Sequence, residues 1–222
     1  EQGFEIFMVQ RNRRSGFLPN AWVFPGGRVD EADAIHGHER IRGGSEVLAR
    51  MGVDEAEATA YLIAGVRETF EEAGIWLGSG DMPWDLREPL GKGEIPLADV
   101  LEEHDAHVNL DLLYAWSWWV TPEIEKRRFD TRFLVATSPS DHGEHDGGET
   151  VNSGWFNPRE VMARAAHGDF PMAPPTSLLE AVLGLRLATW HCMRHLGASR
   201  FSSRMSCSPP FWLPARAALQ LS

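Results

Sequence analysis

The chain has 222 residues, of which 43% are hydrophobic and 24% are charged, and its formal net charge at pH 7 is −11. This length and composition suit one compact domain with embellishments. The excess of negative charge argues against binding to nucleic acid phosphates and to anionic membrane surfaces, and no apolar run approaches the roughly 18 residues of a membrane-spanning helix.

The first elements expected along the chain are two strands separated by a basic turn. The apolar run 4–9 predicts a largely buried strand, and residues 21–24 predict a second, short strand. Between them, residues 10–16 carry several arginines, including Arg11, in an otherwise acidic chain. The beginning of the sequence has neither the basic nor the apolar stretch of a secretory signal, so we expect none.

The second predicted strand leads into a glycine-rich loop. Phe24 and Pro25 are followed by Gly26 and Gly27, and such a pair of glycines lets the backbone approach a ligand or an ion closely. Asp33 lies six residues after Gly27. The ring of Phe24 is a candidate for stacking on a base, although an aromatic residue at a strand end more often belongs to the core.

Two helices are expected after this loop. The segment 45–51 predicts a helix that ends at Gly52. Asp54 is a suitable N-cap for a second helix that begins at Glu55. This helix is expected to run to Gly74, which fits a C-cap.

The end of the second helix carries three carboxylates. Glu68, Glu71 and Glu72 occupy positions i, i+3 and i+4, which share one helix face. Three like charges at this spacing repel, and Arg67 is the nearby base that offsets them. A divalent cation removes the penalty, and hard cations such as Mg²⁺ prefer carboxylate oxygens. The alternative is a solvated acidic face on which Arg67 pairs with Glu71.

The second half of the chain alternates between strand and helix signals. Strands are expected over 112–121, 131–137 and 150–156, and helices over 97–104, 157–168 and 175–195. The tail from Ser199 is rich in Ser, Pro and Arg, and we expect it to be poorly ordered or peripheral. The two cysteines, Cys192 and Cys207, do not make a disulfide framework, which favours a reducing, intracellular compartment.

The glycine loop and the acidic helix together resemble the signature of the Nudix hydrolases, G-x5-E-x7-R-E-U-x-E-E-x-G-U, where U is a bulky aliphatic residue. Gly27 matches its first glycine, and residues 67–75 match its second half in full spacing. There are three departures: Asp33 replaces a Glu, Thr69 replaces an aliphatic residue, and residues 34–66 replace a seven-residue spacer. A helical insert at this place resembles the branch that includes the peroxisomal coenzyme A diphosphatase.

The resemblance implies an α/β (α+β) Nudix fold, in which a mixed β-sheet lies between helices. We place this domain over 1–198, with 34–66 as a helical insertion, and 199–222 as a peripheral tail. The implied activity is hydrolysis, dependent on Mg²⁺ or Mn²⁺, of the diphosphate bond in a nucleoside diphosphate linked to another moiety, with coenzyme A or acyl-CoA preferred.

The alternative is a Nudix-fold sensor that binds a nucleotide without cleaving it. A sensor would be expected to lose the carboxylates of the signature, and all three are present, which favours the enzyme. We expect a cytoplasmic protein whose partner is a small molecule and not a nucleic acid or a membrane, and a homodimer stays open.

The resemblance also assigns roles to single residues of the signature. The metal ligands it implies are Glu68, Glu71, Glu72 and the backbone carbonyl of Gly26. Arg67 is expected to reach Asp33 and hold the loop against the helix, although Asp is one methylene shorter than the usual Glu. Gly27 and Gly74 are expected to support the loop and the end of the helix. The catalytic set comprises Glu71, Glu72, Arg67 and a general base.

The general base in this superfamily is either a carboxylate of the signature or one on a later loop. The polar loop 142–149 is such a place, and we assign the base first to Glu149 and second to Glu144. A solvated acidic loop is one alternative. A zinc site through His142 and His145 is another, which no cysteine pair and no helical His-x3-His supports.

Substrate phosphates call for arginines, whose planar fork matches a phosphate group. We assign Arg11 and Arg132 to this role, with Arg128 as a third candidate, although each is as readily a surface charge. For coenzyme A, the basic turn would meet the extra phosphate. The tryptophan-rich strand over 112–121 and the insert over 34–66 would then border the channel of the pantetheine arm.

Overall fold

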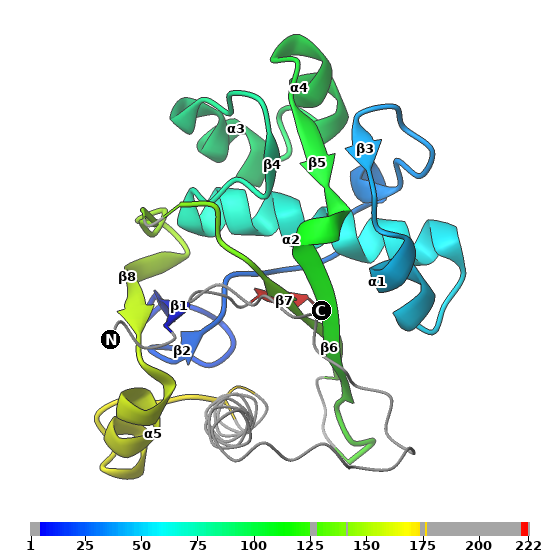
Figure 1. The fold of residues 1–222 in the computed structure, drawn as a ribbon. Helices are drawn as coiled ribbons and strands as arrows, with labels where there is room; N and C mark the ends of the chain where they lie inside the picture. Colours follow the sequence, from blue (N-terminus) through cyan, green and yellow to red (C-terminus); the bar gives the residue numbers. More distant parts are fainter. Residues whose placement is uncertain (1–4, 125–127, 141, 174–175, 177–218, 222) are drawn as a thin grey trace, which may run out of the picture.

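The computed structural model describes residues 5–124, 128–140, 142–173, 176 and 219–221 (Figure 1). The helices in this part of the chain are α1 (Ser45–Arg50), α2 (Glu55–Ala73), α3 (Arg87–Gly91), α4 (Leu97–Glu103) and α5 (Pro158–Ala166). The strands are β1 (Ile6–Arg11), β2 (Trp22–Val23), β3 (Ile41–Arg42), β4 (Gly78–Ser79), β5 (His107–Asn109), β6 (Leu113–Val120), β7 (Asp130–Ala136), β8 (Thr150–Phe156) and β9 (Leu219–Leu221). Short 3-10 turns lie at Glu31–Asp33, Trp84–Leu86 and Leu110–Leu112.

The described strands are divided among three sheets of three strands each, in the orders β2-β1-β8, β3-β5-β4 and β6-β7-β9. The first and third sheets are antiparallel. The second is mixed, because β3 runs parallel to β5 and β4 runs antiparallel to it. The prediction of a mixed α+β fold is confirmed, with its strands distributed over three sheets.

Strand β1 separates two parts of the core. Phe7 and Val9 point to a large cluster that includes Leu62 of α2, whereas Ile6 and Met8 point to a second cluster. The second cluster also contains Val161 of α5 and Phe170. Because alternate residues of a strand face opposite sides, the β2-β1-β8 sheet lies between α2 and α5 (Figure 1). This arrangement agrees with the predicted sheet between helices.

The long helix α2 begins and ends as its sequence predicts. The side chain of Asp54 accepts a hydrogen bond from the backbone N–H of Glu57 at 2.9 Å, which satisfies one of the unpaired donors at the start of the helix. At the other end, Gly74 is left-handed (φ 67°) and donates to the carbonyl of Phe70. A Cβ on Gly74 would lie 2.2 Å from the ring of Trp84, so both backbone and space require glycine.

Residues 34–66 contain β3, α1 and the first part of α2. The helices expected over 45–51 and from Glu55 onward are confirmed. Strand β3 was not predicted, because two residues are too few to show a periodicity, and its pairing with β5 depends on a partner far along the chain. That this range is an insertion stays a prediction.

The C-terminal tail lies mostly outside the described residues. Its residues 219–221 form β9, which pairs antiparallel with Arg132–Leu134 of β7, and the expectation of a poorly ordered or peripheral tail stays a prediction. An open edge of β7 offers unpaired backbone groups to any segment that reaches it. The helix predicted over 175–195, Cys192 and Cys207 lie outside the described residues. Within those residues, no helix is both long and apolar enough to cross a membrane.

Candidate active site

A buried arginine pins the glycine-rich loop to α2. Arg67 donates through Nε and Nη2 to the two carboxylate oxygens of Asp33, at 2.8 and 3.0 Å, and through Nη2 to the carbonyl of Arg28 at 2.9 Å. Asp33 is fully buried, and its Oδ2 also accepts from the backbone N–H of Asp30 at 2.8 Å. The expected contact between Arg67 and Asp33 is therefore present, and the shorter Asp side chain suffices to make it.

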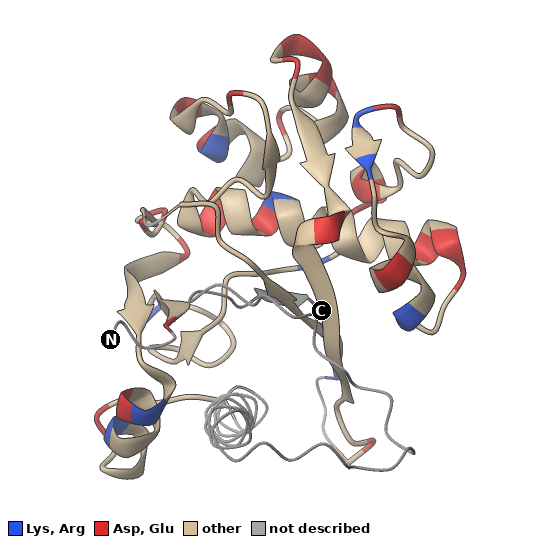
Figure 2. Cartoon of the chain, in the orientation of Figure 1, with Lys and Arg blue, Asp and Glu red and all other residues tan. Residues whose placement is uncertain are grey.

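The remaining guanidinium nitrogen of Arg67 faces the carboxylates of α2. Nη1 lies 3.1 Å from Oε1 of Glu68 and 3.1 Å from each carboxylate oxygen of Glu71. Figure 2 shows acidic and basic residues next to each other on α2. The Arg67–Glu71 pair of the alternative interpretation is present, but the face is not solvated, because Glu71 and Glu72 are only 8% and 6% exposed.

The third carboxylate contacts the glycine pair directly. Oε2 of Glu72 accepts a hydrogen bond of 2.9 Å from the backbone N–H of Gly26. A Cβ on Gly27 would lie 2.2 Å from Oε1 of Glu68, so any other residue would displace this carboxylate or the loop. The supporting role predicted for Gly27 thus has a steric basis, since the acidic side chain occupies the space of the missing Cβ.

Burial makes the negative charge of these side chains costly. It raises the pKa of Glu68 to about 7, raises that of Glu71, and raises that of Glu72 well above its usual value. After burial, the charges of Glu68 and Glu149 also raise the pKa of Glu72. The N–H of Gly26 and the charge of Arg11 lower it. Arg11 and Glu149 therefore belong to the electrostatic surroundings of Glu72.

This donor set fits a hard divalent cation by its chemistry. Several carboxylates and a peptide carbonyl are the oxygen ligands that Mg²⁺ and Mn²⁺ take, and a cation would relieve the cost of their buried charge. In the structure Glu68 and Glu71 accept from Arg67, and no three His, Cys, Asp or Glu side chains of the described residues converge as a metal site. A cation held by all three glutamates would therefore have to compete with Arg67 for two of them.

The metal-free protein is expected to lose stability as the pH rises from about 5 to about 8. The folded-state pKa of Glu68 is about 7, against an ordinary 4.5, so the folded state retains a proton that the unfolded state has released. The loss amounts to on the order of 3 kcal/mol once the group is fully ionised. Thermal unfolding in a chelator across this range measures it.

The matched variants for this measurement are Glu68→Gln and Glu46→Gln. Glu68→Gln should make the decline shallower, because the amide does not titrate, while the raised pKa values of Glu71 and Glu72 leave a residual slope. Glu46→Gln should retain it, because Glu46 forms an exposed pair with Arg50. A Glu68→Gln protein with the same slope as the wild type would show that Glu68 does not ionise in this range.

The loop predicted to carry the general base lies at the C-terminal end of α2. The backbone N–H of Glu144 donates to the carbonyl of Ala73 at 2.9 Å, and the N–H of Glu149 donates to Oδ2 of Asp146 at 3.0 Å. Both glutamate side chains are exposed. Nδ1 of His145 contacts Oγ of Ser153 at 3.2 Å, and the zinc alternative for this loop is not tested by the structure.

The predicted substrate residues are not brought together. Arg11 lies in the surroundings of Glu72, with its Nε donating to the carbonyl of Phe17 at 3.2 Å. Arg132 is 6% exposed and donates to the carbonyl of Met51 at 2.9 Å. Phe24 is 2% exposed in the second core cluster, so its ring has no open face for a base in this structure.

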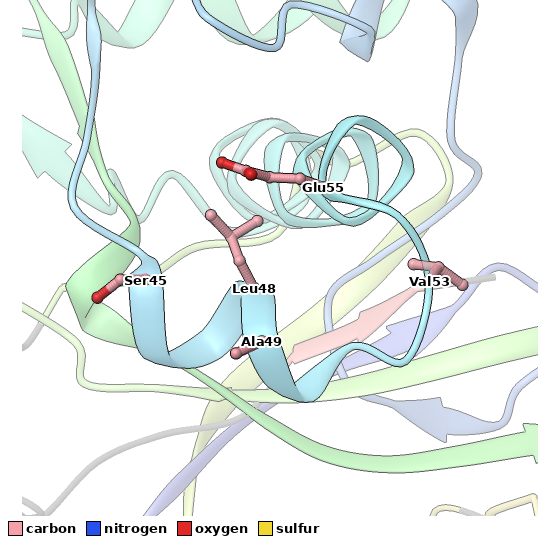
Figure 3. A pocket seen from close by; sticks show the side chains of 5 residues that line it. All are labelled: Ser45, Leu48, Ala49, Val53 and Glu55. Atoms are coloured by element: carbon pink, nitrogen blue, oxygen red, sulfur yellow. The ribbon is translucent and has the colours of Figure 1, made fainter.

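Two further features lie away from the carboxylates: the third arginine candidate and a surface hollow. Nε of Arg128 donates to the carbonyl of Thr121 at the end of β6. A hollow of about 330 Å³ lies between α1 and the start of α2, with the side chain of Leu48 directed toward α2 (Figure 3). Its lining residues are Ser45, Leu48, Ala49, Val53 and Glu55. Glu55 is about 20 Å along the helix from Glu68, so this hollow is separate from the carboxylate site.

Sequence reasoning missed one buried residue beside the site, Arg87. Its Nε lies 3.0 Å from the carbonyl oxygens of both Phe70 and Glu71, and its Nη2 lies 2.8 Å from that of Glu144. A single arginine in a segment rich in Gly, Pro and Asp carries no pattern that distinguishes it. Only the packing of α3 against α2 reveals its position.

An acidic helix pinned by a buried Arg–Asp pair to a Pro-Gly-Gly loop defines a Nudix domain. The crystal structure of a Nudix hydrolase from Alicyclobacillus acidocaldarius is similar to this chain, with a TM-score of 0.71 and 26% identity, over 83% of this chain and 85% of that one. More specifically, the family model described as NUDT19 Nudix domain matches residues 50–180. This match spans more than half of the chain, which therefore belongs to the NUDT19 Nudix family within the Nudix hydrolases.

Relatives with described activities are found in vertebrates. The acyl-coenzyme A diphosphatase NUDT19 of Gallus gallus is 30% identical over 78% of this chain and 59% of its own length. The proteins of the same name from Homo sapiens and Xenopus laevis are 28% and 26% identical, over 78% and 72% of this chain and 59% and 54% of their own lengths. The chain thus spans somewhat more than half of the length of these relatives.

Proposed function

We propose that this protein hydrolyses the diphosphate bond of a nucleoside diphosphate linked to another moiety, with coenzyme A or an acyl-CoA as the preferred substrate and Mg²⁺ or Mn²⁺ as cofactor. The observation that carries the proposal is the set of buried glutamates on α2 facing the Gly26–Gly27 loop. A fold gains nothing by burying like charges, whereas a site for a cation and a polyanionic substrate requires them.

The bound metal would supply positive charge that offsets the charge of the diphosphate and of the leaving group. Glu68, Glu71 and Glu72 would hold it, together with the carbonyl of Gly26. Arg67 holds the helix against the glycine-rich loop through Asp33. The oxygen ligands from the helix and from the loop are therefore kept at a fixed position relative to one another.

The other assigned roles rest on electrostatics. Glu149 is our first choice for the general base, because its charge acts on Glu72 and its side chain is exposed to solvent water. Glu144, whose backbone is tied to the end of α2, is the second. Arg11 is our first choice for an arginine that meets a phosphate, because its charge acts on the same glutamate.

The substrate assignment rests on the relatives and on the basic turn. Three relatives are named acyl-coenzyme A diphosphatase, and the chain shares their family. Arg13 and Arg14 are exposed next to Arg11, so the turn can offer positive charge to the extra phosphate of coenzyme A. Arg132 and Phe24, which we also assigned to substrate, would require rearrangement of buried contacts to reach it.

The alternative function is a nucleotide sensor without turnover. Retention of Glu68, Glu71 and Glu72, of which the last two are buried, favours the enzyme. The cytoplasmic location inferred from the cysteine content and a homodimeric state stay predictions.

The proposal predicts metal-dependent turnover with a preference for coenzyme A. With Mg²⁺ or Mn²⁺, kcat/KM for coenzyme A should exceed that for dephospho-coenzyme A and ADP-ribose by about tenfold, the effect of one added phosphate–arginine contact. Arg13→Gln with Arg14→Gln should reduce this ratio without affecting ADP-ribose hydrolysis. A kcat/KM for coenzyme A equal to or lower than the other two values would contradict the substrate assignment and leave the hydrolase proposal intact. Absence of turnover on a panel of diphosphates, together with tight nucleotide binding, would favour the sensor.

A further inference from the structure

The C-terminal end of α2 depends on an arginine that is not part of the Nudix signature. Arg87, the first residue of α3, is 8% exposed, and its Nε donates to the carbonyl oxygens of Phe70 and Glu71 at 3.0 Å each. The last carbonyls of a helix lack intrahelical donors and form the negative end of its dipole. The carbonyl of Phe70 already accepts from the N–H of Gly74, so the buried guanidinium adds a second donor there, a donor for the carbonyl of Glu71, and positive charge at the turn that carries Glu71 and Glu72.

The same guanidinium also reaches the loop over 142–149. Nη2 of Arg87 donates to the carbonyl of Glu144 at 2.8 Å, and the N–H of Glu144 donates to the carbonyl of Ala73 at 2.9 Å. The peptide groups on both sides of Glu144 are thus fixed to the end of α2, one directly and one through Arg87. The other end of the loop is held elsewhere, because the backbone N–H of Asn12 donates to the carbonyl of Glu149 at 2.9 Å and its side-chain amide donates to the carbonyl of Gly148 at 3.0 Å.

An aromatic ring packs on Arg87. Together with the bonds of Arg87 to the end of α2 and to Glu144, this contact forms what we call the Arg87 clamp. The guanidinium carbon of Arg87 lies 4.3 Å from the ring centroid of Trp84, in a cation–π contact. The edge of the same ring occupies the space that a Cβ on Gly74 would take. Trp84 therefore contacts the arginine and the C-cap together.

We propose that Arg87 is a positioning residue that holds the Glu144 end of the loop 142–149, which carries our second candidate for the general base, against the carboxylate-bearing end of α2. The proposal rests on the proposed hydrolase function. It requires the planar fork of arginine, because three carbonyl oxygens on two segments are bonded by one rigid group. A lysine ammonium would keep the charge without the geometry.

The test compares Arg87→Met, Arg87→Lys and the control Arg50→Met in steady-state kinetics. Loss of the clamp should lower kcat on the order of 100-fold, with KM changed by less than about threefold, since misplacement of a reacting group affects the chemical step. Arg50 lies in an exposed pair with Glu46, so its variant should match the wild type. Free guanidinium, at concentrations far below those that unfold proteins, should restore part of the kcat of Arg87→Met, whereas equal NaCl should not.

Amide hydrogen exchange supplies a readout that does not depend on turnover. In both Arg87 variants, faster exchange should be confined to residues 142–149 and the last turn of α2. Exchange that rises throughout the protein, or full activity in Arg87→Lys, would overturn the positioning role. If the wild type hydrolyses no diphosphate, the proposed function fails, and the exchange pattern alone then decides whether Arg87 ties the loop to the helix.

Discussion

Replacing Glu72 by glutamine is expected to lower kcat by about 100- to 1000-fold while leaving the melting temperature unchanged or raised. The glutamate is 6% exposed and its pKa is raised well above the usual value, so its ionised form is costly to the metal-free fold. The amide oxygen of glutamine can still accept the N–H of Gly26, which preserves the contact with the loop. The substitution therefore removes the negative charge that a cation would need and keeps the shape of the side chain.

The companion variants separate this role from a general effect of charge. Glu71→Gln should reduce turnover similarly but gain less stability, because Glu71 also pairs with Arg67. Glu46→Gln, on an exposed face of α1, should change neither property. Turnover like that of the wild type in both Glu71→Gln and Glu72→Gln would remove the assigned role from these residues. A collapse of stability in Glu72→Gln would instead assign the carboxylate to the fold.

Replacing Arg67 by methionine is expected to destabilise the protein by about 3–5 kcal/mol and to abolish turnover. The guanidinium donates to Asp33, Glu68, Glu71 and the carbonyl of Arg28. Its removal leaves buried acceptors without their donor and releases the glycine-rich loop from α2. For a chain of this length, the melting temperature should fall by about 10 °C.

A double-mutant cycle with Asp33→Asn isolates the pair. Because Arg67 and Asp33 bond each other through two hydrogen bonds, the double variant should be more stable than the sum of the single losses predicts. Arg50→Met, which breaks an exposed pair, should cost less than about 1 kcal/mol. Additive losses at Arg67 and Asp33 would show that the two side chains act independently and would contradict the pinning of the loop.

Local signals in the sequence are enough to predict the acidic helix and its boundaries. Asp54 and Gly74 act on the backbone within a few residues, and the spacing of Glu68, Glu71 and Glu72 fixes a shared face whatever the helix packs against. Such local signals are complete in the sequence. The resemblance that they carry, with the Pro-Gly-Gly loop, was sufficient to predict the fold class and the family.

How the acidic helix, the glycine-rich loop and the strands pack together is visible only in the folded protein. Whether the acidic face is solvated or buried depends on the segments that cover it, and burial raises the pKa of Glu72. The inward orientation of Phe24 and the pairing of β9 with β7 result from contacts with residues distant in sequence. Arg87 meets the end of α2 because α3 packs there. These outcomes are set by long-range packing and dielectric surroundings, which no local spacing in the sequence encodes.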